Sequence, residues 1–161
     1  MRALLVAIAV FVFTAPVSAA EWQTIRAGES TQAQARTQFG AATKTTSQKV
    51  EGYDSVQWLY EGGQAPKGVR RLTIDFGILT PQGYRPDVVR QMLVEPAPGV
   101  FVRPTVLAGW GEPDGVATEG EAKVMSYRSG LFVYFDKDGW NVERMYFTPP
   151  QPATTGAPPR R

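Results

Sequence analysis

Apolar and polar residues alternate along the middle of the chain with the period of two that is typical of strands buried on one face. The first alternating stretch places three large residues on one side: Val56, Trp58 and Tyr60. The second places apolar residues opposite polar ones: Leu72, Ile74 and Phe76 against Arg71, Thr73 and Asp75. A loop over residues 80–86 leads to a third predicted strand over 88–94. Such short connections imply antiparallel neighbours.

Helix signals precede both sets of strands. Ser30 can cap a helix over residues 31–39, and Gly40 follows where a left-handed residue is favoured. Pro104 suits the first turn of a second helix that ends at Trp110, because its missing N–H is not needed there. Three further strands follow this helix, over residues 123–127, 131–135 and 142–147.

The second half repeats the pattern of the middle in the same order. Residues 72–77 (LTIDFG) return as 131–136 (LFVYFD), and residues 89–96 (VRQMLVEP) return as 142–149 (VERMYFTP). Such self-similarity is typical of one supersecondary unit used twice. We therefore predict an α+β protein of two tandem units, residues 21–96 and 97–149. Each unit is a short helix plus a three-stranded antiparallel sheet, with the helices packed on one sheet face.

The residues of both units resemble a known family. The run Ile25 to Ser30, the helix end at Phe39-Gly40 and the Trp58-Leu59-Tyr60 strand are similar to the SmpA/OmlA (BamE) domain of bacterial cell envelopes. Gly111-Glu112-Pro113 supplies the family's Gly-x-Pro in the second unit. Two such units in tandem resemble the layout of beta-lactamase inhibitory protein. The resemblance implies a protein-binding role in outer-membrane assembly or maintenance, or in inhibition of an enzyme.

The two ends of the chain predict an exported protein. Residues 1–20 have the pattern of a signal peptide, with Arg2, an apolar stretch too short to span a bilayer, and small residues that suit cleavage after Ala19 or Ala20. An uncleaved N-terminal anchor is the alternative. Residues 150–161 are rich in Pro and predict a disordered tail, for which a spacer or partner-binding role is the alternative. We expect a periplasmic or secreted protein without a stable membrane anchor.

The composition excludes several classes of chemistry. The chain has no Cys and no His, which removes thiol nucleophiles, Ser-His-Asp triads, His-ligated zinc and disulfides. Its 17 Lys and Arg residues stand against 15 Asp and Glu residues and are scattered, so no nucleic-acid surface is indicated. We predict a protein that is not an enzyme, needs no cofactor, and binds another envelope or secreted protein.

The segment Asp136-Lys137-Asp138-Gly139 fits two interpretations. Alternating carboxylates with Gly can coordinate calcium, but the segment lacks the further ligands and the terminal Glu of an EF-hand loop. Asp-Gly between two strands is also typical of a hairpin turn. We favour the turn and predict no metal site.

A comparison of the two copies gives the candidate binding residues. Three residues on the predicted solvated face of the first copy become aromatic in the second: Thr73, Asp75 and Leu93 correspond to Phe132, Tyr134 and Tyr146. Exposed rings need a cover. Either these strands are buried on both faces, or the three rings, rimmed by Trp140, bind a partner. Carbohydrate can stack on the same rings, so a glycan-binding or glycan-processing envelope protein is the alternative function.

Overall fold

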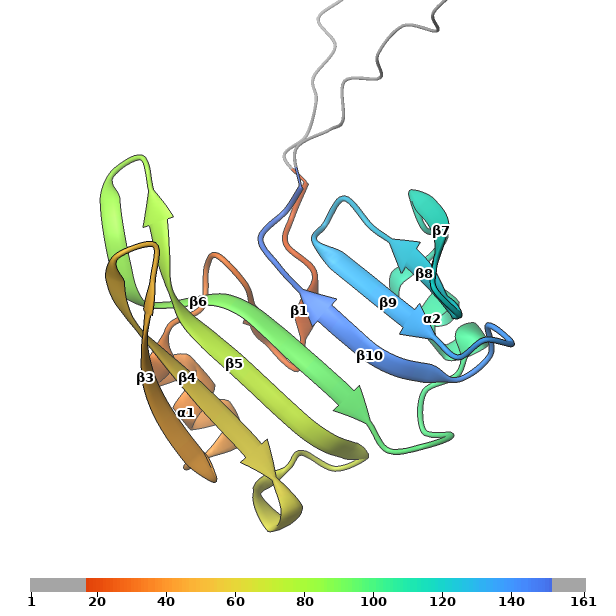
Figure 1. The fold of residues 1–161 in the computed structure, drawn as a ribbon, viewed down its shortest axis with the longest axis horizontal. Coiled ribbons are helices and arrows are strands. Elements are labelled where there is room, and N and C mark those ends of the chain that lie inside the picture. Colours follow the sequence, from red (N-terminus) through yellow and green to blue (C-terminus); the bar gives the residue numbers. More distant parts are fainter. Residues whose placement is uncertain (1–16, 152–161) are drawn as a thin grey trace, which may run out of the picture.

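The computed structural model describes residues 17–151, which form a large antiparallel sheet backed by two α-helices (Figure 1). Most of the predicted signal peptide and nearly all of the predicted tail lie outside the described residues. In chain order the elements are β1 (Glu21–Trp22), β2 (Ile25–Arg26), α1 (Gln32–Phe39), β3 (Lys44–Val50), β4 (Tyr53–Glu61), the 3-10 helix η1 (Gly62–Gln64), β5 (Val69–Thr80), β6 (Gly83–Pro96), α2 (Arg103–Trp110), β7 (Gly115–Glu119), β8 (Ala122–Ser126), β9 (Leu131–Phe135) and β10 (Val142–Phe147).

The eight longer strands form one continuous sheet in the order β3-β4-β5-β6-β10-β9-β8-β7. The two halves of the chain meet where β6 pairs with β10, and this register places Phe147 opposite Met92 and Met145 opposite Val94. The predicted pair of helix-plus-three-strand α+β units is therefore wrong. Each half supplies four strands, and the last strand of one half pairs with the last strand of the other, so the fold is mainly antiparallel β.

The resemblance to tandem SmpA/OmlA (BamE) units is wrong for the same reason, because the molecule is built on one eight-stranded sheet. The motifs behind the resemblance lie where they were predicted. Gly40 and Gly111 follow the two helices, and Trp58 and Tyr60 lie on β4. These motifs specify helix ends and one strand, but they do not specify how the strands of the two halves pair.

Local signals set the two helices. Thr31 caps α1 through a capping box, in which its hydroxyl accepts from the backbone N–H of Gln34 and the Gln34 side chain accepts from the N–H of Thr31. The cap is thus Thr31 and not the predicted Ser30. Pro104 lies in the first turn of α2 as predicted. Within residues 17–151 no helix is long and apolar enough to cross a membrane.

Both helices pack on the same face of the sheet and close a single core. Phe39 of α1 contacts Tyr60 of β4 with ring centroids 5.8 Å apart, and Trp110 of α2 lies 6.0 Å from Phe147 of β10. One row of buried side chains crosses the six central strands: Tyr60, Leu72, Val94, Met145, Val133 and Met125. The core therefore runs from the first half into the second without interruption.

The segment before α1 connects the two halves. Trp22 is buried in the core. The backbone N–H of Gly28 donates to the carbonyl of Val89 in β6 (2.7 Å), while that of Ala20 donates to the carbonyl of Ser129 between β8 and β9 (2.8 Å). One short stretch of chain is thus hydrogen-bonded to both halves of the sheet.

Candidate functional site

The sheet face opposite the helices, which we call the open face, is covered by neither α1 nor α2 (Figure 1). Its residues alternate with the core residues along every central strand. One row of this face crosses the sheet through directly opposed residues: Leu59, Thr73, Leu93, Tyr146 and Phe132. The open face therefore changes from aliphatic and polar on the first half to aromatic on the second.

Phe132 and Tyr134 of β9 and Tyr146 of β10 form an aromatic cluster on the open face. All three residues are partly exposed. The rings of Tyr134 and Tyr146 meet edge to face with centroids 5.7 Å apart, and the guanidinium of Arg144 lies 4.3 Å from the centre of the Tyr134 ring. The structure thus brings together three of the four predicted binding residues. It adds Arg144, which the comparison of the copies does not single out.

Two polar groups of this cluster, the Tyr134 phenol and the Arg144 guanidinium, lie in unusual environments. Burial raises the pKa of Tyr134, and the charge of the nearby Glu119 carboxylate and a hydrogen bond to it raise that pKa further. The Nε atom of Arg144 is buried and has no hydrogen-bond partner within residues 17–151. A buried donor without a partner carries a desolvation cost.

Trp140 lies apart from the aromatic cluster, in the connection between β9 and β10. Its side chain is 53% exposed. Its backbone N–H donates to Asp136 Oδ1 (2.9 Å), and its carbonyl accepts from the N–H of Arg103 (2.9 Å). Within the described residues no ring contact links Trp140 to the cluster. Its predicted place at the rim of a binding surface stays a prediction.

The carboxylate of Asp136 organises the turn between β9 and β10. Its Oδ2 accepts from the Asn141 side chain (2.8 Å), and its Oδ1 accepts from the N–H of Trp140 (2.9 Å). The hydrogen bonds from the Asn141 side chain, and then from the Trp140 backbone, hold the pKa of Asp136 below its usual value. These carboxylate oxygens serve the turn, in line with the hairpin interpretation of the Asp-Gly segment.

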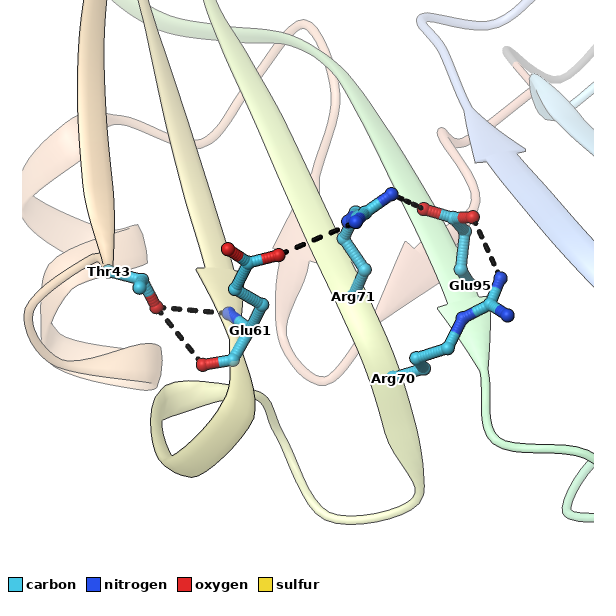
Figure 2. A network of polar contacts seen from close by, with 5 residues as sticks. All are labelled: Thr43, Glu61, Arg70, Arg71 and Glu95. Atoms are coloured by element: carbon cyan, nitrogen blue, oxygen red, sulfur yellow. Dashed lines mark hydrogen bonds and ion pairs between the residues drawn. The ribbon is translucent and has the colours of Figure 1, made fainter.

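A charged band continues the open face across the first half, and consists of Glu61, Arg71, Glu95 and Arg70 (Figure 2). Arg71 lies between the two glutamates, 3.5 Å from each, and Arg70 lies 3.0 Å from Glu95. The Arg71 and Glu61 side chains are 48% and 43% exposed. Exposed pairs of this kind contribute at most about 1 kcal/mol each, so the band is a polar surface and not a source of fold stability.

Asp75 is the one buried carboxylate of the described residues, and it lies on the open face of β5, where the row of Thr73 separates it from Arg71 of the charged band. Its side chain is only 8% exposed, whereas the sequence predicts a solvated position. Amide groups surround it: Gln57 donates to Oδ1 and Gln91 to Oδ2, both at 2.8 Å, and Gln48 donates to Oδ1 at 3.3 Å. Asp75 thereby fixes the orientation of three glutamine side chains on the open face.

Asp75→Asn is expected to lower the free energy of unfolding by about 1–3 kcal/mol, because it removes a charged acceptor and places an NH₂ group against amide donors. Equilibrium urea unfolding measures the loss. Asp54→Asn is the matched control, since the Asp54 side chain is 89% exposed in its pair with Lys49 and should change stability by about 0.5 kcal/mol or less. Equal losses in the two variants would show that the amide cluster around Asp75 is unimportant.

A cavity of about 530 Å³ lies between the end of β6 and the start of β10. Its lining includes Arg70 and Glu95 of the charged band and Arg144 of the aromatic cluster. The cavity therefore lies against both the charged band and the aromatic cluster of the open face. Its charged residues have both signs, so it does not select for a small anion or cation.

Comparisons with known proteins add little to this description. No protein-family model and no curated protein sequence matches the chain. Among solved structures, a DUF4309 family protein (YjgB) from Bacillus subtilis subsp. subtilis strain 168 is similar, with a TM-score of 0.47 and 11% sequence identity. The match covers 79% of this chain and 83% of that chain. A likeness this distant carries no functional information, so function has to be inferred from the residues of the chain itself.

Proposed function

We propose that this chain is an exported, non-catalytic protein that binds another envelope or secreted protein through the aromatic cluster on its open face. The observation that carries the proposal is that Phe132, Tyr134 and Tyr146 lie partly exposed on a sheet face that neither helix covers. Burial of such rings against a partner is favourable, and Tyr and Arg are enriched at interface centres. Roles in outer-membrane assembly or enzyme inhibition followed from the BamE resemblance and lose that support with it.

The charged band supplies a polar rim for such an interface. Arg71 and Glu61 remain about half exposed, so a partner can pair with them without first breaking a buried contact. Charges at a rim steer association and fix orientation more than they add affinity. The aromatic cluster would provide most of the binding energy, and the band would set how the partner is placed.

The chemistry of the open face favours binding over catalysis. Nucleophilic catalysis generally needs an activated nucleophile with an adjacent base, and the sequence has neither His nor Cys. The carboxylates of the face already have partners, since Asp75 accepts from three amides and Glu95 pairs with Arg70 and Arg71. These carboxylates are therefore occupied by contacts within the fold.

The double substitution Phe132→Ser and Tyr134→Ser tests the proposal. Immobilised wild-type chain should capture a partner from envelope extract, and the double variant should capture it about 100-fold less, because two interface anchors of about 1–2 kcal/mol each are removed. Quantitative mass spectrometry of the captured proteins measures the ratio. Circular dichroism and thermal unfolding must show that the variant is folded.

The control is the double substitution Leu79→Ser and Val116→Ser, which removes two apolar side chains that are 56% and 66% exposed and lie outside the cluster. It should capture the partner as well as the wild type does. Undiminished capture by the folded cluster variant would contradict the proposal. Unfolding of the cluster variant would also contradict it, since the rings would then be part of the core.

Glycan binding is the second candidate, and one observation favours it. The open face combines ring faces with fixed amides, because Asp75 orients Gln57 of β4 and Gln91 of β6, and β6 is the neighbour of β10 in the sheet. Sugars are recognised by stacking on rings and by hydrogen bonds to such planar polar groups. Co-sedimentation with purified peptidoglycan separates the candidates. Sedimentation that is lost on Tyr134→Ser would replace the protein-binding proposal with glycan binding.

A further inference from the structure

We infer that the exported chain is cleaved between Ala19 and Ala20, so that the mature protein begins at Ala20. The inference rests on the proposed export. The sequence leaves two bonds open, because small residues at the last and third-last positions of a leader suit cleavage after Ala19, with Val17, and after Ala20, with Ser18. The structure distinguishes between these two bonds.

Ala20 is part of the folded structure. It is 5% exposed and belongs to the hydrophobic core cluster. Its backbone N–H donates to the carbonyl of Ser129 at 2.8 Å, and this bond connects the N-terminal segment to the turn between β8 and β9. Ala19 is equally buried, but it is not a member of that cluster, and within residues 17–151 no backbone hydrogen bond outside the strands involves it. Only Ala20 thus joins the core and the turn.

The turn that Ala20 contacts depends on several such bonds. The carbonyls of Arg128, Ser129 and Gly130 accept from Gln151, Ala20 and Thr148 respectively, at 2.8 to 2.9 Å. The turn is thus bound from both ends of the described chain. Removal of Ala20 would leave one of these three carbonyls without its donor and would remove a core methyl group, at a cost to stability.

Cleavage one residue earlier preserves these contacts. The nitrogen of Ala20 becomes the α-ammonium, which keeps a donor for the Ser129 carbonyl and gains charge, and charge-assisted hydrogen bonds are stronger than neutral ones. The folded structure therefore tolerates cleavage after Ala19 and is weakened by cleavage after Ala20.

Expression of the full chain in a Gram-negative host, followed by N-terminal sequencing of the protein recovered from the periplasm or medium, tests the inference. We expect the sequence Ala-Glu-Trp-Gln. A mature chain that begins with Glu21 would overturn the cleavage site and leave export intact. A chain that retains residues 1–19 would overturn both the site and the proposed export. If the mature chain begins at Ala20 but captures no partner, only the binding proposal would be overturned.

Two variants sharpen the assignment, because a bulky residue is excluded from the position before the cleaved bond. Ala20→Gln should still be cleaved after residue 19. Ala19→Gln should accumulate as precursor or be cleaved after Ala20, and the chain that begins with Glu21 should melt about 3 °C or more below the wild type. N-terminal sequencing identifies the cleaved bond whether or not the variant folds. The reverse pattern, with Ala20→Gln blocked and Ala19→Gln cleaved normally, would overturn the inference.

Discussion

Phe147→Ala is expected to lower the free energy of unfolding by about 3–5 kcal/mol, the range typical of a large aromatic residue removed from a core. Phe147 is fully buried on β10. It lies opposite Met92 of β6 and Leu131 of β9, and it packs against Trp110 of α2. The substitution opens a cavity where the two halves of the sheet meet. Guanidinium unfolding followed by tryptophan fluorescence measures the loss.

Tyr146→Ala is the control, because Tyr146 is the preceding residue on the same strand and points to the open face, where it is partly exposed. Its truncation should cost only about 1 kcal/mol, as is usual for partly exposed sites. An equal or larger loss than that of Phe147→Ala would show that the two faces are assigned the wrong way round.

The same experiment tests whether the two halves unfold together. One hydrophobic core includes Trp58 of the first half and is contacted by Trp110 of the second. A continuous core predicts a single cooperative transition, with the same midpoint by fluorescence and by far-UV circular dichroism, in both the wild type and Phe147→Ala. Two separate transitions would mean that the β6–β10 contact is too weak to couple the halves.

The elements with one buried face are predictable from the sequence. Tyr60, Leu72 and Val133 each alternate with polar or open-face residues, and each belongs to a strand found within a few residues of its predicted position. Both helices are also found within about one residue of prediction, since their first turns and the glycines that follow them carry strong local signals. Local chemistry determines these features, so no knowledge of the sheet is needed.

The two edge strands are not predictable in this way. β3 has the sequence KTTSQKV and β7 has GVATE, and both are exposed along most of their length. An edge strand with both faces exposed to solvent shows no apolar alternation, so it is recognised only by its pairing with the neighbouring strand. The predicted loop over residues 80–86 fails for a related reason. Only residues 81 and 82 turn, and the hairpin continues because Tyr84 stacks on Tyr53 with centroids 4.5 Å apart.

The continuity of the sheet depends on a contact between distant residues, and the repeat alone does not reveal it. A hint is present in the composition of β6 and β10. Free edges of two small sheets usually carry charged residues and are short, because such edges resist pairing with other chains. Instead β6 and β10 carry apolar residues where they pair, as central strands do: Met92, Val94, Met145 and Phe147.

The candidate site was predictable in part. The aromatic substitutions between the copies identify Phe132, Tyr134 and Tyr146 because matched strand positions face the same way. The burial of Asp75 is not predictable, because the glutamines that surround it come from three different strands and meet only through the strand register of the folded sheet. Polar residues on a predicted solvated face do not indicate from sequence alone which of them will bury a neighbouring side chain from solvent.

Gly130→Ala is expected to cost about 3 kcal/mol or more, which falls among the largest single-site effects. Gly130 lies between β8 and β9 with φ of 91°, and a Cβ added there would lie 2.1 Å from the carbonyl oxygen of Thr148. Backbone atoms cannot move aside at low cost, so residues 148 and 149 would have to leave the turn. The two hydrogen bonds from Thr148 to the Gly130 carbonyl would then be lost. Urea unfolding measures the change.

Gly52→Ala separates the clash from the backbone conformation. Gly52 has nearly the same φ, 87°, but a Cβ there would meet no atom within 4 Å, so the variant carries only the left-handed penalty of about 1–2 kcal/mol. The difference between the two variants therefore reports the contact between the turn and Thr148. Because the carbonyl of Ser129, the residue before Gly130 in this turn, accepts from Ala20, Gly130→Ala should also expose the N-terminal segment to limited proteolysis, while Gly52→Ala should not. Equal stability and equal protease resistance would mean that the turn does not hold Ala20 and residues 148–151 in place.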